Sequence, residues 1–316
     1  MAEMAKKYAF GIDLGGTTVK IGLFSGEGEL VYSHEIPTRT ENGGVKILPD
    51  IAEAVREDME KYSIGKEQLA GIGLDVPGPV VKESVVIRCV NLGWGVFNAA
   101  DELKKLTGIE NIKAANDANA AALGEMWKGG GRGHDSIVMV TLGTGVGGGI
   151  IVDGKIVSGA NGAAGEIGHM MVREDETDVC GCGKCGHLEQ YASATGIARV
   201  GRKMLAASDQ PSALRDIDHV SARNIFDAAK AGDALALDIV EEVCRVLGNA
   251  LAAITTVTDP EVIVIGGGVS KAGPILIETT KKYYRKAAFH AAEDCEFALA
   301  ELGNNAGMFG AVKMIL

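Results

Sequence analysis

The stretch YAFGIDLGGTTVKIGLF, residues 8–24, decides how we interpret the fold of this chain. An apolar run ends at Asp13, small residues follow, and apolar residues then alternate as far as Phe24. Alternation with a period of two is typical of a strand, and the pair Gly15 and Gly16 is typical of a tight turn. The stretch therefore predicts a β-hairpin with a tip of small residues.

A second stretch repeats this pattern. It predicts a strand over 136–142, a glycine-rich turn over 143–149 and a returning strand over 150–157. Backbone N–H groups in such turns can form anion-binding nests, because small residues allow a ligand to approach the chain. Two such tips predict one phosphate-bearing ligand, and Asp13 could bind its Mg²⁺ directly or through water.

Two other phosphate-binding motifs can be tested directly in the sequence. No GxxxxGK[ST] occurs, which excludes a Walker-type site. Gly143, Gly145 and Gly148 match GxGxxG, and Glu166 follows at a suitable distance for a ribose contact. A dinucleotide-binding fold needs a helix after these glycines, however, and the β-branched residues there predict a strand.

The rest of the chain alternates between helices and strands, which predicts α/β domains. Helices are expected at 45–62, 118–127, 190–206, 222–231, 234–256, 274–289 and 306–315, and residues 103–106 are expected to lie within another. Further strands are expected at 30–36, 69–76, 112–115 and 261–265.

The charge and composition exclude several classes of protein. A net charge of −11 disfavours binding to nucleic acid or to an anionic membrane, both of which need basic patches. The first residues lack a long apolar segment, and no run approaches the roughly 18 apolar residues of a membrane span. We therefore expect a cytoplasmic protein, with Cys89, Cys244 and Cys295 reduced and buried.

The segment GEIGHMMVREDETDVCGCGKCGHLE, residues 165–189, predicts a metal site. It contains His169, Cys180, Cys182, Cys185 and His187, whose sulfur and nitrogen atoms suit a tetrahedral Zn²⁺. Four protein ligands would leave no open position, so the metal would be structural and would hold the surrounding loop.

Carboxylates elsewhere are candidates for chemistry. Asp117, at a strand-to-helix junction, could accept the proton of an attacking hydroxyl in phosphoryl transfer. The alternative is that Asn116 or Asp117 is only the N-cap of the following helix. Glu166, His169 and Glu189 are polar residues among glycines, and together they suit a polyhydroxylated ligand.

The order of these motifs resembles that of the ROK family (repressors, open reading frames and kinases), and most closely that of its bacterial glucokinases. The motifs are GIDLGGTTVK at 11–20, VPGP at 76–79, VNLGW at 90–94, NDANAAALGE at 116–125, TLGTGVGGG at 141–149, GEIGH at 165–169, the cysteine segment at 180–189 and IVIGGG at 263–268. They extend over nearly the whole chain.

The resemblance implies a two-domain α/β fold of the actin-like and hexokinase-like (ribonuclease H-like) type, with the active site in the interdomain cleft. A small domain would comprise 1–115 and 304–316, and a large domain would comprise 116–303 with the zinc loop. The implied activity is ATP-dependent phosphorylation of glucose at its 6-hydroxyl. Members of the family are usually dimers or tetramers.

The resemblance also implies roles for individual residues. Asp117 would be the general base, and the sugar would be bound by Asn116, Glu166, His169, Glu189 and Gly78. Mg²⁺·ATP would be bound by Asp13, Gly15, Gly16, Thr17, Thr18, Lys20, Gly143, Thr144, Gly145, Gly266, Gly267 and Gly268.

One departure from the family concerns the zinc ligands. The family pattern, CxCGxxGCLE with an upstream histidine, is matched by His169, Cys180 and Cys182. His187 stands where the last cysteine is expected, and Cys185 lies two residues earlier. Either could complete the site, and we favour His187 because it keeps the spacing.

Two other functions remain open at this stage. The chain could be a ROK kinase for another sugar, such as N-acetylmannosamine, N-acetylglucosamine or fructose. It could also be a sugar-responsive transcriptional repressor, although only twelve residues precede Asp13. That leaves no room for the helix-turn-helix that such repressors carry before this motif, and we expect no binding to DNA.

Overall fold

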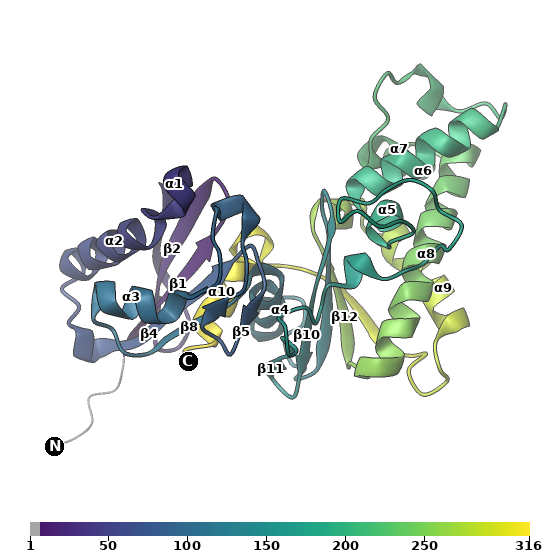
Figure 1. Ribbon diagram of the computed structural model, residues 1–316. Helices are drawn as coiled ribbons and strands as arrows, with labels where there is room; N and C mark the ends of the chain where they lie inside the picture. The colour runs from purple at the N-terminus through teal and green to yellow at the C-terminus, as the bar shows by residue number, and fades with distance from the viewer. Residues whose placement is uncertain (1–6) are drawn as a thin grey trace. The chain divides into compact units, whose positions relative to one another are not determined.

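The predicted first hairpin is present in the computed structural model, which describes residues 7–316 (Figure 1). β1 (Tyr8–Leu14) pairs antiparallel with β2 (Thr18–Ser25), and β3 (Leu30–Pro37) continues the sheet beyond β2. On the other side of β1, β4 (Leu69–Val76) and β8 (Ile112–Asn116) are added in parallel. The strand order is β3-β2-β1-β4-β8, so the carboxyl ends of β1, β4 and β8 lie at the same edge.

Helices cover both faces of this sheet. They are α1 (Glu41–Gly44), α2 (Ile47–Lys61), α3 (Ala99–Thr107), α4 (Asp117–Lys128) and α10 (Ala306–Lys313). Short strands β5 (Val80–Val81), β6 (Val85–Val86) and β7 (Phe97–Asn98) form a separate small sheet. Short 3-10 turns lie at Lys66–Gln68, Val90–Leu92 and Gly303–Asn305.

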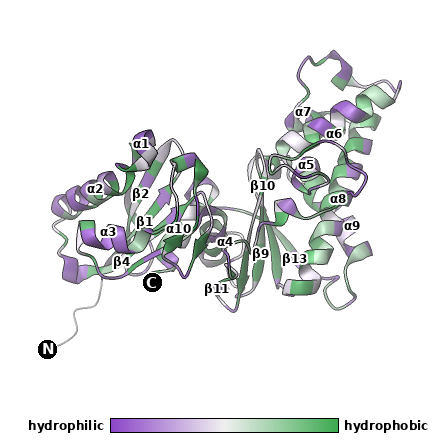
Figure 2. Ribbon diagram, viewed as in Figure 1, coloured by the Kyte–Doolittle hydropathy of each residue, from purple (hydrophilic) through white to green (hydrophobic). Residues whose placement is uncertain are grey.

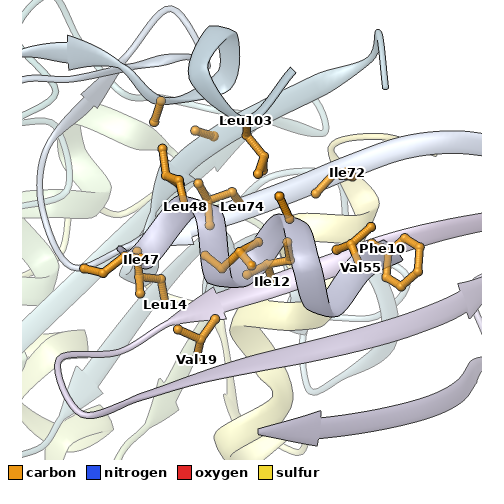
Figure 3. Close-up of a cluster of buried hydrophobic side chains, with 14 of the residues drawn as sticks. Phe10, Ile12, Leu14, Val19, Ile47, Leu48, Val55, Ile72, Leu74 and Leu103 are labelled. Atoms are coloured by element: carbon orange, nitrogen blue, oxygen red, sulfur yellow. The ribbon is translucent and has the colours of Figure 1, made fainter. Parts of the chain in front are cut away.

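The core of this part follows from the period of the strands. Alternate residues of β1, including Phe10 and Ile12, face a buried cluster with Leu48 and Val55 of α2, as Figure 3 shows. The intervening Ala9 belongs to a second cluster, which packs against α10. The hairpin strand is therefore apolar on both faces because helices cover both.

The second glycine hairpin lies in a sheet with the order β11-β10-β9-β12-β13. Its strands are β9 (Ile137–Leu142), β10 (Val146–Val152), β11 (Lys155–Ile156), β12 (Val262–Gly266) and β13 (Glu296–Leu299). β12 pairs in parallel with β9, as β4 does with β1, so the two hairpins begin sheets of the same design. Figure 2 shows β9 as hydrophobic along most of its length.

The helices after the second hairpin pack mainly on one another. They are α5 (Glu189–Ala192), α6 (Ala194–Ala207), α7 (Ala222–Lys230), α8 (Ala234–Thr258) and α9 (Pro274–Ala287). Shorter 3-10 turns are η3 (Ile167–His169), η4 (Ala213–Asp216) and η5 (Gly268–Ala272). None of the helices in the described chain is long and apolar enough to cross a membrane.

The chain falls into two compact units. The first comprises the chain up to Asp135, Gly149–Gly165 and Leu302–Leu316, and the second comprises Ser136–Gly148 and Glu166–Glu301. This differs from the predicted boundary after residue 115, because α4 belongs to the first unit. The physical reason is that α4 packs closely on α10, where glycines allow the two backbones to touch.

Local expectations needed three corrections. The returning strand expected over 150–157 is divided, because the chain turns at Asp153 and Gly154 between β10, which ends at Val152, and β11. The glycine-rich turn expected over 143–149 is shorter, because β10 already begins at Val146. The helix expected over 190–206 is divided at Ser193, whose hydroxyl accepts the Gly196 N–H and caps α6. Cys89, Cys244 and Cys295 are free and buried, as predicted.

Candidate active site and metal centre

The first glycine tip joins β1 to β2 in the first unit. The Gly15 N–H donates to the Thr18 carbonyl at 2.9 Å, which closes the turn. At the end of β1, the Asp13 carboxylate lies 3.5 Å from Lys20 Nζ, and both side chains are only 23% exposed. Lys20 also donates to the Asn304 carbonyl at 2.6 Å. It is therefore a fixed, half-buried cation beside Asp13, not a solvated strand residue.

Asn116 and Asp117 have separate roles at the start of α4. Asn116 is the N-cap: its Oδ1 accepts the N–H groups of Ala118 and Asn119 at 3.0 and 3.3 Å. Its Nδ2 donates to the Gly78 carbonyl at 3.3 Å, which brings two predicted sugar-binding residues together. Asp117 is exposed, and its Oδ1 accepts the Ala118 N–H at 2.8 Å. Because Asn116 supplies the cap, capping does not by itself explain the Asp117 carboxylate.

Asp75 is an acidic residue of this unit that sequence reasoning missed. It lies on β4 in register with Asp13 on β1, and it is completely buried. Neither of its carboxylate oxygens has a hydrogen-bond donor as a partner among the described residues. Burial raises its pKa well above the usual range, and the charges of Asp13 and Asp117 add to this. The residues over 69–76 predict only an apolar strand, and a single acid within it is no recognisable signal for a site.

We expect Asp75→Asn to stabilise the protein progressively as the pH rises. A carboxyl whose pKa is raised by folding holds its proton better in the folded chain. Its stabilising contribution is therefore present below the unfolded pKa of about 3.9 and is lost as the pH rises through the folded pKa. Asn is neutral at every pH. Within that window, the free energy of unfolding of the variant should therefore rise relative to that of the wild type by about 1.4 kcal/mol per pH unit.

Urea unfolding of both proteins between pH 4.5 and 8 measures this difference. The control is Asp101→Asn, which alters an exposed carboxylate in the same unit. Parallel stability curves for the wild type and Asp75→Asn would show that Asp75 is not held in its protonated form.

The second glycine tip lies in the second unit and contacts Glu189. Glu189 Oε2 accepts the Val146 N–H at 3.1 Å, and a Cβ on Gly145 would lie 2.2 Å from the same oxygen. A side chain at position 145 would therefore require the Glu189 carboxylate to move. The Ala194 N–H donates to the Gly143 carbonyl at 2.8 Å, and the Thr195 hydroxyl donates to the Thr144 carbonyl at 2.7 Å. The tip is thus fixed to the start of α6.

A cavity of about 810 Å³ opens beside this tip, within the second unit. Thr144 and Gly268, both predicted to bind the nucleotide, line it together. Arg202, His219 and Phe226 also line it. These residues lie in helices and a loop that contain no recognisable motif. Their place in the cavity could therefore not be predicted from the sequence. The volume lies in the range of small-molecule and cofactor sites.

Four of the predicted metal ligands converge in the second unit. His169, Cys180, Cys182 and His187 each offer one ligand atom, and all four atoms lie within 4.8 Å of one another. Two sulfurs and two imidazole nitrogens form a donor set that suits Zn²⁺. Cys185 lies outside this group, with its Sγ 3.8 Å from the Thr177 carbonyl. Glu189 adjoins the group, since its Oε1 is 3.5 Å from Cys180 Sγ.

These features define a class of protein. Two glycine hairpins begin sheets of the same strand order, and polar residues lie at or next to the ends of the parallel strands of the first sheet. This is the two-domain hexokinase-like α/β fold. Residues 9–316 match the ROK family, and the chain belongs to that family.

Known relatives agree with this assignment. The chain is 42% identical to the glucokinase of Halalkalibacterium halodurans, over 97% of this chain and 94% of that protein. It is 37% identical to the glucokinase of Thermotoga maritima, over 99% and 98%. Among solved structures, the ROK family glucokinase from Streptomyces griseus, in complex with glucose and AMPPNP, has a TM-score of 0.71 at 31% identity, covering 97% of this chain and 98% of that one. The predicted family and fold class are confirmed.

Proposed function

We propose that this protein transfers the γ-phosphoryl group of ATP to the 6-hydroxyl of glucose. The observation that carries the proposal is the exposed Asp117 carboxylate at the start of α4, next to an Asn116 that already serves as the cap. The glucokinase relatives and the glucose complex of the Streptomyces griseus protein support the choice of substrates.

In this proposal Asp117 acts as the general base. Its carboxylate accepts the proton of the sugar 6-hydroxyl while that oxygen forms a bond to the γ-phosphorus. The bond from phosphorus to the β–γ bridging oxygen breaks, and ADP leaves with that oxygen. Asn116, Glu166, His169 and Glu189 orient the sugar through hydrogen bonds to its other hydroxyls.

The nucleotide is proposed to use the two glycine tips and the cavity of the second unit. Thr144 and Gly268 line this cavity, and we propose that their backbone N–H groups contact phosphate oxygens together with that of Gly145 in the same tip. Phe226, in the wall of the cavity, would offer an apolar surface to a base. Asp13 provides the carboxylate oxygen that Mg²⁺ prefers, and Mg²⁺ would neutralise charge on the phosphates when bound. Lys20 balances the charge of Asp13.

We propose a structural zinc held by His169, Cys180, Cys182 and His187. Support comes from the convergence of these four donors and from the position of Cys185 outside the group. Zinc would fix the loop that precedes Glu189, and it would take no part in the phosphoryl transfer.

We expect Cys185→Ser to retain the metal and Cys182→Ser to lose it. Serine at 185 removes no donor from the converging group, whereas serine at 182 replaces one of its two sulfurs. Wild type and Cys185→Ser should each contain about one zinc per chain, because a closed four-ligand site binds tightly. Elemental analysis of the purified proteins measures this. Equal loss of zinc in both variants would instead assign Cys185 to the site.

We further propose that the protein acts in the cytoplasm. All six of its cysteines are free in the structure, and disulfides persist mainly in oxidising compartments. A reducing compartment would also keep the two metal-binding sulfurs as thiolates.

An assay for the formation of sugar phosphate tests the proposed reaction, because this product is common to every phosphoryl donor. It compares glucose, mannose, fructose, N-acetylglucosamine and N-acetylmannosamine, with ATP, ADP and polyphosphate as alternative donors. We expect kcat/KM with glucose and ATP to exceed that of any other pair by about tenfold or more. A preference for an N-acetylated sugar would keep the family assignment and overturn the choice of substrate, and absence of turnover would overturn the reaction.

A further inference from the structure

The loop that carries the metal-binding residues has a second set of contacts, separate from the metal ligands. The loop runs from Met170 to Leu188, between η3 and α5. It contains little regular structure: isolated bridges pair Met171 with His187 and Val179 with Cys185. Such a loop needs other interactions to hold one conformation, because ordering each residue costs roughly 1–2 kcal/mol.

Glu176 provides the most extensive of these interactions. Its side chain is only 6% exposed, although it lies in a loop. Oε2 accepts hydrogen bonds from the Tyr191 hydroxyl at 2.6 Å and Arg199 Nη1 at 2.8 Å. Oε1 accepts from Lys203 Nζ at 3.2 Å and from the backbone N–H groups of Thr177 and Asp178 at 3.1 and 3.0 Å. Both oxygens are fully satisfied, so the buried charge is compensated.

The ionisation of Glu176 agrees with this geometry. Burial alone would raise its pKa, but hydrogen bonds from Tyr191, the Asp178 backbone, Arg199 and Lys203 outweigh burial and lower it. Glu176 is therefore a carboxylate at any pH at which the enzyme would work.

A short path of hydrogen bonds leads from Glu176 to the candidate site. Arg199 Nε and Nη2 donate to the Gln190 carbonyl at 3.2 and 3.0 Å. The Gln190 side chain then joins two parts of the loop: its Nε2 donates to the Asp178 carbonyl at 2.7 Å, and its Oε1 accepts the His187 N–H at 3.0 Å. Glu189 is the neighbouring residue in α5. The way in which this loop packs on α6 therefore affects the positions of both His187 and Glu189.

We propose that Glu176 is a positioning residue, which holds the metal-bearing loop against α6 and so keeps Glu189 and His187 in place for sugar and metal. The inference rests on the proposed roles of those two residues. No local pattern of residues indicates this role, because the side chains that contact Glu176 lie 15, 23 and 27 residues away along the chain.

Glu176→Gln tests the proposal, with Asp178→Asn as the matched control. Asp178 pairs with the same Arg199 and Lys203 at 2.6 Å each, but its side chain is 47% exposed, so water replaces its contacts easily. Glutamine keeps the size of Glu176 and replaces one acceptor oxygen with an NH₂ group. In one orientation of the amide, the NH₂ group would face the donors of Arg199 and Tyr191. In the other, it would face the donors of Lys203 and the backbone.

Two kinetic readouts distinguish positioning from a general loss of stability. With Glu176→Gln we expect zinc to pass to a chelating dye about tenfold or more faster than from the wild type. We also expect the KM for glucose to rise by about tenfold, with kcat and the KM for ATP changed by less than about twofold. Asp178→Asn should change each quantity by less than about twofold.

Limited trypsin digestion provides a third readout that needs neither zinc nor turnover. Lys184 is exposed at the turn of the loop, and faster cleavage there in Glu176→Gln would report the loss of loop order. Tyr191→Phe removes one hydrogen bond from the same carboxylate and should give intermediate effects, which covers the case in which Glu176→Gln does not fold.

The outcomes separate this inference from the proposed function. Wild-type protein without zinc would overturn the metal centre, while trypsin cleavage and the glucose KM would still test Glu176. Unchanged zinc release, glucose KM and cleavage in both Glu176→Gln and Tyr191→Phe would overturn the positioning role. Effects of Asp178→Asn as large as those of Glu176→Gln would assign the role to general charge pairing.

Discussion

Replacing Asp117 with alanine is expected to lower kcat for glucose phosphorylation by about 10³-fold, with glucose binding still measurable. General-base catalysis typically contributes 10²–10⁴-fold, because the attacking hydroxyl must lose its proton as the new bond forms. Fold and stability should change little, since Asn116 caps α4 and Asp117 is exposed. Steady-state kinetics give kcat, and calorimetric titration with glucose gives binding.

Two controls make this result specific. Asp117→Asn keeps the shape and cannot accept the proton at neutral pH, so it should be nearly as inactive as the alanine variant. Asp101→Ala removes another exposed carboxylate from the first turn of a helix in the same unit, α3, and should leave kcat within about twofold. Turnover of Asp117→Ala at more than a tenth of the wild-type rate would refute the assignment of the base.

Gly310→Ala is expected to destabilise the protein by about 2 kcal/mol. A Cβ at Gly310 would lie 1.7 Å from the Ala120 carbonyl oxygen and 2.5 Å from the carbonyl carbon, so backbone and not a flexible side chain must move. The contact is reciprocal, because a Cβ at Gly124 would lie 2.2 Å from the Ala306 oxygen. Alanine favours a helix over glycine by about 1 kcal/mol. Overpacking against backbone outweighs that gain.

Urea unfolding at neutral pH measures the change in the free energy of unfolding. Gly95→Ala is the control, because a Cβ there meets nothing within 4 Å and the residue is exposed. Equal stability of Gly310→Ala and wild type would mean that α4 and α10 can separate slightly without loss of packing.

The periodicity of apolar residues was sufficient to predict most of the helices and strands. The strands of the first hairpin, α2 and α8 carry apolar residues at the spacing of their own structure, and each was predicted within a few residues. The order of the motifs was sufficient to identify the family. Ser193 shows where such reasoning fails: the apolar pattern continues through it, but its side chain caps a new helix.

The candidate site was predictable only in part. The residues of the glycine tips, Asn116, Asp117 and the cysteine segment were identified because each lies in a recognisable local motif. Asp75 and Glu176 were not identified, because a single acidic residue is no local signal and the roles of both depend on groups distant in the sequence. The choice between His187 and Cys185 was likewise open in the sequence, and the structure brings His187 to the other donors.

By itself, the sequence determined the elements, the two glycine hairpins and the family, because these depend on residues that are close together along the chain. Only the tertiary structure decided which unit α4 joins, which four donors converge, and that a buried acid lies beside Asp13. The physical reason is that burial, charge pairing and close backbone contact are properties of residues that meet in space. Their energies depend on distance and surroundings, which no local pattern of residues records.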